Sequence, residues 1–254
     1  MKKLVPLILI ASFVTTGFLR ASTVSWQAFV NTGIIDQSNN ALATGNWLQI
    51  GIFVGLTNSQ IITDAQTQAG TAILAAAFQP FGGSSGQIQI NTGSQVGNGA
   101  GSFAASTTQP NSALPINFQG QQIYLWAIKA SNNTTVTTAE ATVLEQAIVT
   151  STLSNWKFPS SDSTPPTSTA IDIDNLFNGT GAAGATVNSN AVPLAGNLLP
   201  LANNASLHQA APTGGGFGAV NSAIQLAPVP EPSTFTLCVL AALSAAGSRR
   251  RSRK

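Results

Sequence analysis

The stretch at residues 121–130 constrains the fold more than any other, because it is apolar on both faces of a potential strand. It reads Q-Q-I-Y-L-W-A-I-K-A, and successive side chains of a strand point to opposite faces. One face would carry Ile123, Leu125 and Ala127, and the other Tyr124, Trp126 and Ile128. A strand with two apolar faces needs a packed layer on each, so we expect residues 121–130 at the centre of a sheet.

Shorter strand-like segments recur along the chain between turns rich in Gly, Ser and Asn. They lie at residues 23–30, 47–56, 87–91, 102–107 and 171–174. Residues 57–78 have apolar side chains at helical spacing, with Thr57 or Ser59 as the N-cap and Gly70 as an interruption. Residues 140–150 fit a helix or a strand. We therefore predict a mainly β fold, an antiparallel β-sandwich-like domain with one or two short helices, besides a signal helix and a hydrophobic helix at the two ends.

The last part of the chain, residues 229–254, divides into three chemically distinct segments. The motif Pro230-Glu231-Pro232 comes first, and each proline fixes φ and keeps the preceding residue out of the helical region. As a helix, the apolar run at 233–247 would span roughly 22 Å, less than the ~30 Å hydrocarbon core of a bilayer. The basic tail at 248–254 strengthens a membrane assignment, because it would hold the C-terminus on the cytoplasmic side. Its arginines are Arg249, Arg250, Arg251 and Arg253.

This order of segments resembles the PEP-CTERM sorting signal of Gram-negative bacteria, and the resemblance covers only residues 229–254. It implies recognition by an exosortase, a membrane cysteine protease-transpeptidase. That enzyme would remove the tail and deliver the body to the cell surface or to exopolysaccharide. Periodicity alone also allows a buried helix followed by a solvated basic tail. The body contains G-Q-Q-I-Y-L-W and a later N-W-K-F-P, and in this it is similar to bodies of other sorting-signal proteins of unassigned function.

The N-terminus has the pattern of a secretory signal peptide, which we place at residues 1–21. Two lysines precede an apolar run at 4–19, and Ala21 is the expected last residue of the leader. With the basic residues of both ends inside, the rest of the chain would lie outside. It divides into an extracytoplasmic body at 22–205 and a Gly/Pro/Ala-rich linker at 206–228.

The charges of the body differ from those of the whole chain. Between residues 22 and 229 the only basic side chains are Lys129 and Lys157, against seven acidic ones, which leaves a net charge of −5. An acidic body argues against nucleic-acid binding, which requires a basic patch. Only 7% of all residues are charged, against ~25% in ordinary globular domains. Since the lone Cys238 lies in the apolar run at 233–247, the body would have no disulfide.

Few residues have the types and spacing that catalysis or metal binding requires. The single histidine, His208, lies in the approach to the linker, so neither a catalytic triad nor a zinc site is expected. Asp172 and Asp174 are candidate calcium ligands, alone or with Asp162. Alternating aspartates are more typical of a solvated edge strand. Glu140 and Glu145 could form a glycosidase pair but fit surface charges better. We expect no cofactor.

The four tryptophans separate two interpretations of the body. Each lies in an apolar run, which favours core packing over a sugar-stacking platform. Trp156, beside Lys157 and Pro159, is the best candidate for an exposed, ligand-stacking member.

Together these features predict a non-enzymatic protein, exported across the inner membrane and anchored there before it reaches the cell surface or matrix. Its partners would be the general secretion machinery, an exosortase, the membrane before processing, and exopolysaccharide, but not nucleic acid. The first alternative is a carbohydrate-binding or adhesion module, with a calcium ion or an exposed aromatic row. The second is a secreted hydrolase with carboxylates in a cleft.

Overall fold

The computed structural model describes residues 21–28, 32–40, 42, 46–82, 87–89, 103–110, 116–130, 143–163, 165–178, 185–204 and 220–230. Almost all of the predicted signal peptide, the apolar run at 233–247, the arginines of the tail, and His208, Glu140 and Glu231 lie outside these segments. Within them the fold is mainly β, with antiparallel sheets and two α-helices. No helix in this part of the chain is long and apolar enough to cross a membrane.

The largest sheet is antiparallel, and β7 lies at its middle. Its main path runs through β12 (Ala191–Ala195), β8 (Val143–Ser151), β7 (Tyr124–Ala130), β3 (Trp47–Phe53) and β4 (Phe78–Pro80). Beside this path β5 (Gln87–Gln89) pairs with β3, and β15 (Ala227–Pro228) pairs with β8. The predicted central strand is therefore confirmed, and residues 140–150 are resolved in favour of a strand from Val143 onward.

Smaller sheets complete the fold, and two of them contain parallel pairs. One consists of β6 (Phe103–Gln109), β1 (Ser22–Ala28) and β9 (Thr167–Asp172), and another of β13 (Asn197–Asn204), β14 (Val220–Gln225) and β2 (Thr32–Ile35). A two-stranded ribbon joins β10 (Phe177–Asn178) and β11 (Thr186–Val187). Since β1 runs parallel to β9 and β14 runs parallel to β2, the sheets are not antiparallel throughout.

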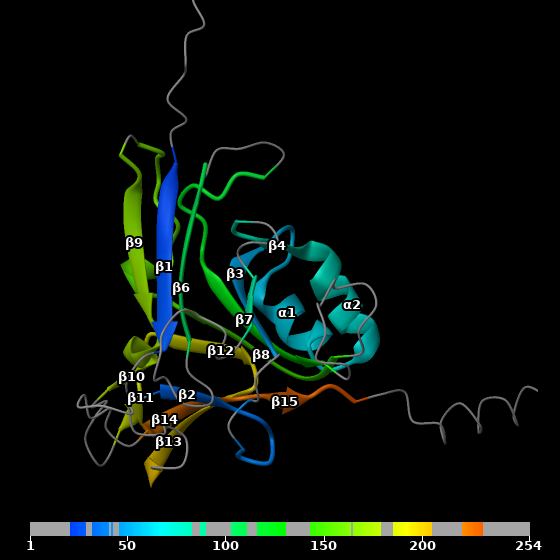
Figure 1. Ribbon diagram of the computed structural model, residues 1–254. Helices are drawn as coiled ribbons and strands as arrows, with labels where there is room; N and C mark the ends of the chain where they lie inside the picture. Colours follow the sequence, from blue (N-terminus) through cyan, green and yellow to red (C-terminus); the bar gives the residue numbers. More distant parts are fainter. Residues whose placement is uncertain are drawn as a thin grey trace, which may run out of the picture.

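Both faces of the largest sheet are buried, as the alternation of residues 123–128 predicts. Leu125 and Ala127 belong to a core shared with Trp26 of β1 and Ile224 of β14. Trp126 and Ile128 belong to a second core, against the helices α1 (Asn58–Asp64) and α2 (Gln68–Ala77). In Figure 1 the helices lie on one side of β3 and β7, and β1, β6 and β9 lie on the other.

The helical segment divides at residues 65–67 rather than at Gly70. The Thr57 hydroxyl accepts a hydrogen bond from the Gln60 amide while the Gln60 side chain accepts from the Thr57 amide, so Thr57 is the N-cap of α1. Thr67 caps α2 in the same way, by accepting from the Gly70 amide at 3.0 Å. Gly70 lies inside α2, where a Cβ would meet the Asp64 carbonyl oxygen, so its role is close packing of the two helices.

The predicted linker at 206–228 is wrong over its last residues. Residues 220–225 form β14, which pairs with β13 on one side and β2 on the other, and its Ser222 and Ile224 are fully buried. The folded body therefore includes residues 220–229, and Val229 is buried and donates its amide to the Leu144 carbonyl. The sequence V-N-S-A-I-Q has only two large apolar residues, and small side chains suffice because β14 is enclosed between two other strands.

Candidate functional site

A pocket opens where β7 separates from β3. The ladder between these strands ends at the pair Gly51–Tyr124, while β3 continues to Phe53. Before Tyr124 the chain instead follows the segment around Trp156: the Ile123 amide donates to the Trp156 carbonyl at 2.9 Å, and Gln122 forms a bridge with Lys157. This change of partner leaves a cavity of about 520 Å³ beside the end of β3.

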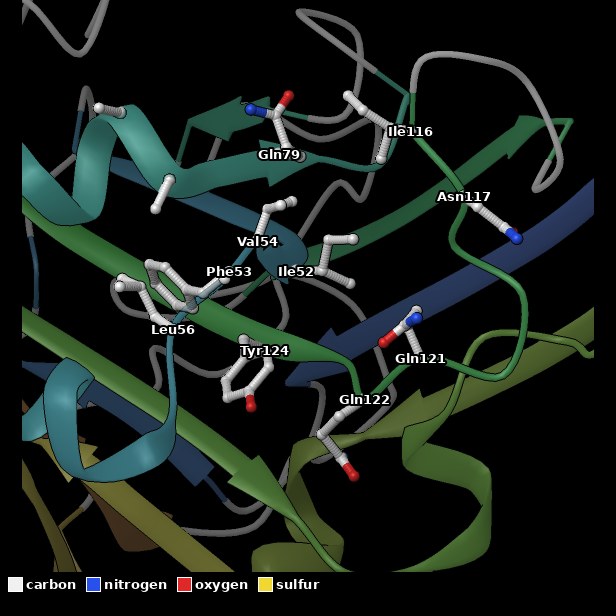
Figure 2. A pocket seen from close by; sticks show the side chains of 13 residues that line it. Ile52, Phe53, Val54, Leu56, Gln79, Ile116, Asn117, Gln121, Gln122 and Tyr124 are labelled. Carbon is white, nitrogen blue, oxygen red and sulfur yellow. The ribbon is translucent and has the colours of Figure 1, made fainter.

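The lining combines an apolar wall with side-chain amides. Figure 2 shows the side chains of β3 between Gln79 and Ile116 on one side and Tyr124 and Gln122 on the other. The apolar residues are Ile52, Phe53, Val54, Leu56, Ala76, Ala77 and Ile116, and the polar ones are Gln79, Asn117, Gln121, Gln122 and Tyr124. None of these described lining residues is a carboxylate, a histidine or a cation, so the pocket offers apolar contact and neutral hydrogen bonding.

An aromatic cluster fixes the apolar wall. The ring of Phe53 lies 4.9 Å from that of Phe78 and 5.3 Å from that of Tyr124, measured between centroids, and both pairs are close to edge-to-face. Trp126 lies behind them, 5.6 Å from Phe53. Edge-to-face pairs at these separations add to the stability gained by burial. The wall is therefore held in place before any ligand binds.

Two polar side chains of the lining are fixed, and two are available to a ligand. Gln122 Nε2 contacts the Thr150 hydroxyl at 2.8 Å and the Trp156 carbonyl at 2.7 Å. The Tyr124 hydroxyl donates to Asn58 Oδ1 at 2.9 Å. By contrast Gln121 is exposed, and Asn117 is exposed with its Oδ1 accepting from the Gln119 amide, which orients its NH₂ group for other acceptors.

Tyr124 stays neutral over the physiological range. Burial raises the pKa of its phenol above the ordinary value of 10.0. The hydroxyl therefore acts as a hydrogen-bonding group, and no nucleophile or base results from it.

Trp156 does not lie on the surface, so the predicted stacking role is wrong. Its side chain is fully buried, and so are those of Trp26 and Trp126. Trp156 ends a short 3₁₀ turn at Ser154–Trp156, which directs the indole into the core, while the neighbouring Lys157 is exposed. Trp156 and Lys157 are adjacent in the sequence, and their pattern does not indicate which of the two side chains faces the core.

The acidic candidates are not brought together. Asp172 Oδ1 accepts from the Asp174 amide at 3.0 Å and so caps the 3₁₀ turn at Ile173–Leu176. Asp162 accepts from the Ser22 hydroxyl at the opposite end of β1. The described part of the chain holds no group of three His, Cys, Asp or Glu side chains that could hold a metal ion. The edge position expected for residues 171–174 is confirmed up to Asp172, since β9 pairs only with β1 in its sheet.

Glu145 is buried, which corrects its interpretation as a surface charge. It contacts Lys129 on the neighbouring strand, while the other half of the proposed glycosidase pair, Glu140, lies outside the described residues. Of the sorting motif, the described segments include only Pro230, which is exposed.

The sequence contained one weak signal for the pocket, the pair Gln121–Gln122 directly before an apolar strand. Comparison with known proteins adds no relative: no protein-family model matches the chain, and neither the curated proteins nor the solved structures give a significant match.

Proposed function

We propose that this chain is a non-enzymatic protein of the cell surface or exopolysaccharide matrix, which is exported and then processed at the sorting signal of residues 229–254. We also propose that its β-sandwich body binds a neutral carbohydrate in the pocket beside β3. The observation that carries the binding role is the lining: exposed amides of Gln121 and Asn117 next to a fixed aromatic and aliphatic wall, with no charged side chain among the described lining residues.

Neutral sugars have the chemistry that such a lining recognises. Their hydroxyl groups donate to and accept from side-chain amides, and their C–H faces pack against apolar and aromatic groups. A uronic acid or a sulfated sugar would bring an anion into a pocket without a described cation, and burying an unpaired charge is costly. The described residues of this lining include no carboxylate pair of the kind that glycoside hydrolysis requires, which favours binding over hydrolysis.

Binding can be measured on the mature protein released by cells, by isothermal titration calorimetry against neutral hexose oligosaccharides, with a sulfated oligosaccharide as the charged comparison. Gln121→Ala removes one hydrogen-bonding group, so affinity should fall by about 2- to 10-fold. Gln66→Ala is the matched control, because Gln66 is an exposed glutamine that is not among the pocket residues. Equal affinities for Gln121→Ala and the unaltered protein, or binding of the sulfated oligosaccharide alone, would overturn the pocket assignment.

Sorting is tested separately, through the intact mass of the surface-released protein from strains with and without the sorting protease. A tail that is missing only when the protease is present supports processing at Pro230-Glu231-Pro232. An unprocessed tail in both strains contradicts it and leaves the binding proposal standing, so the two failures are distinguishable.

A further inference from the structure

Three charged side chains meet at the end of β2, where they join it to the largest sheet. Lys129 of β7 lies with its Nζ 3.0 Å from Asp36 Oδ2 and 2.7 Å from Glu145 Oε1. Glu145 is directly opposite Lys129 in the β7–β8 ladder, and Asp36 directly follows β2. The side chains of Glu145 and Asp36 are only 5% and 13% exposed. The amine is thus held between two largely buried carboxyl groups.

The carboxyl group of Asp36 is polarised on the side away from the amine. Its Oδ1 accepts from the backbone amides of Ser38 and Asn40, each at 2.9 Å. Two backbone N–H groups on one oxygen are the arrangement that stabilises the negative oxygen of a tetrahedral intermediate. The other oxygen, Oδ2, contacts the nucleophile. Asp36 therefore has its leaving oxygen and its stabilised oxygen on different sides.

Glu145 is placed to move the proton. Its Oε2 accepts from the Gln37 amide at 2.8 Å, which leaves Oε1 directed at Lys129 Nζ. A carboxylate that is buried and oriented in this way can take a proton from the amine and return it to a departing oxygen. Gln37 and Asp36 are neighbours in sequence, so the same short segment positions the electrophile and orients the base.

We propose that Lys129 and Asp36 condense to form an intramolecular amide bond, with Glu145 as the proton-transferring group. Glu145 takes a proton from the Lys129 ammonium and passes it to Oδ2 of Asp36, so that the neutral Nζ attacks Cγ of a neutral carboxylic acid. The Nζ–Cγ bond forms, the Cγ–Oδ2 bond breaks, and Oδ2 leaves as water after receiving two protons, the one from Glu145 and another from Nζ. No oxidant or co-reactant is required.

Proximity lowers the activation barrier that this condensation meets between free groups in water. Positioned intramolecular reactions reach effective molarities of about 10⁵ to 10⁸ M. The resting groups form an ion pair: burial opposes its charges, but the contacts to Glu145 and Asp36 outweigh burial and raise the pKa of Lys129. A proton must leave this pair before Nζ can attack, so linkage should increase with time after folding.

The bond would fasten a small sheet to the large one. β2 is held in its sheet by pairing with β14, and a covalent link at its end would attach it to β7. Because the only cysteine is at position 238, the body itself would have no disulfide. The amide link would stabilise the body covalently, as disulfides stabilise other exported proteins.

Intact mass under denaturing conditions tests the proposal on the full chain and on the released protein. The linked protein should be lighter than its sequence by one water molecule. Trypsin adds a second readout: Lys129 is the only cleavage site between Arg20 and Lys157, and an acylated lysine is not cleaved. In the full chain, linkage therefore gives a single fragment of residues 21–157, whereas the unlinked chain gives 21–129 and 130–157. In the released protein without residues 1–21, the corresponding fragments begin at residue 22.

Three variants and one control variant distinguish the link from other losses of water. Lys129→Arg keeps the charge but cannot form the amide, and Glu145→Gln removes the base, so both should retain the full mass. Asp36→Asn should still link, but with loss of ammonia in place of water. Lys157→Arg, at the other lysine of the body, should link like the unaltered chain. A full mass in the aged unaltered protein, or a water loss with cleavage still occurring after Lys129, would overturn the proposal; the latter would indicate a succinimide at Asp36.

Discussion

The indole Nε1 of Trp126 donates a 2.9 Å hydrogen bond to Oε1 of Gln146, and both side chains are fully buried beneath the helices. The amide nitrogen of Gln146 donates to the Ala65 carbonyl and to the Thr71 hydroxyl, each at 3.0 Å. The Gln146 side chain thus provides hydrogen-bond partners for the indole on β7, the C-cap carbonyl of α1 and a hydroxyl of α2. This network aligns the helices on the largest sheet.

Gln146→Leu should destabilise the body by about 2–4 kcal/mol, because it leaves several buried polar groups without partners. Guanidinium denaturation measures the loss as a lower midpoint at unchanged slope. Gln66→Leu is the matched control at an exposed glutamine and should change stability by less than about 0.5 kcal/mol. A similarly small change for Gln146→Leu would show that the network contributes little.

Thr57→Ala should cost about 1 kcal/mol, because it removes the hydroxyl half of the capping box of α1. Thr63→Ala serves as the comparison: that exposed hydroxyl donates only to the Ser59 carbonyl one turn earlier in the same helix. The thermal midpoint should fall for the first variant and stay nearly constant for the second. Equal midpoints would contradict a capping role for Thr57.

The local sequence pattern was sufficient to predict the elements in which apolar, buried residues recur at a regular spacing. The alternation from Ile123 to Ile128 gave both the strand and its central position, since each face reads as apolar independently of its partners. Thr57 was one of two predicted caps, with Ser59, because the capping signal lies within four residues, and the structure selects Thr57. The break between α1 and α2 at residues 65–67 was not predicted. Thr67 was not recognised as the N-cap of a second helix, and Gly70 was taken as an interruption although it is a position where the two helices pack closely.

Pairing between distant segments could not be predicted. Strand β9 lies parallel to β1 although their sequences are separated by more than half of the chain, and neither shows in its own residues which partner it takes. The pocket has the same origin, since it exists only because Gln122 pairs near Lys157 instead of continuing along β3. Such features depend on topology: the pair Gln121–Gln122 marks polar residues before an apolar strand, but no local signal shows which distant segment they pair with.

Trp156→Ala should destabilise the body by about 3–5 kcal/mol, because it opens a cavity at a fully buried site. Affinity for neutral oligosaccharides should remain within about twofold of the unaltered protein when both are folded, since the indole does not line the pocket. Denaturation and calorimetry on the same preparation measure the two effects. Loss of affinity without loss of stability would restore Trp156 as a ligand-stacking residue.

The Asp36 carboxylate should stabilise the fold only above acidic pH. Its contribution to the free energy of unfolding is best measured in Glu145→Gln, because that variant should lack the amide bond. Burial raises the pKa of Asp36, but the Asn40 amide, Lys129 and the Ser38 amide outweigh it, so the pKa lies below 3.8. A depressed folded pKa means that the contribution is complete above about 3.8 and is lost as pH falls through the lower folded value. Unfolding free energies of Glu145→Gln, with and without Asp36→Asn, should therefore converge in strong acid. A constant difference at every pH would contradict the shift.

The Tyr124 phenol can be titrated without interference, because it is the only tyrosine in the chain. Burial raises its folded pKa above 10.0, so the tyrosinate absorbance of the native protein should rise at a higher pH than that of the protein in guanidinium. Since the folded pKa is the higher one, the stability linked to Tyr124 is complete below pH 10.0 and is lost as pH rises through the folded value. A neutral oligosaccharide bound in the pocket should bury the ring further and raise the midpoint again. A native midpoint at or below the unfolded one would mean that Tyr124 is solvated, and would remove it from the wall of the pocket.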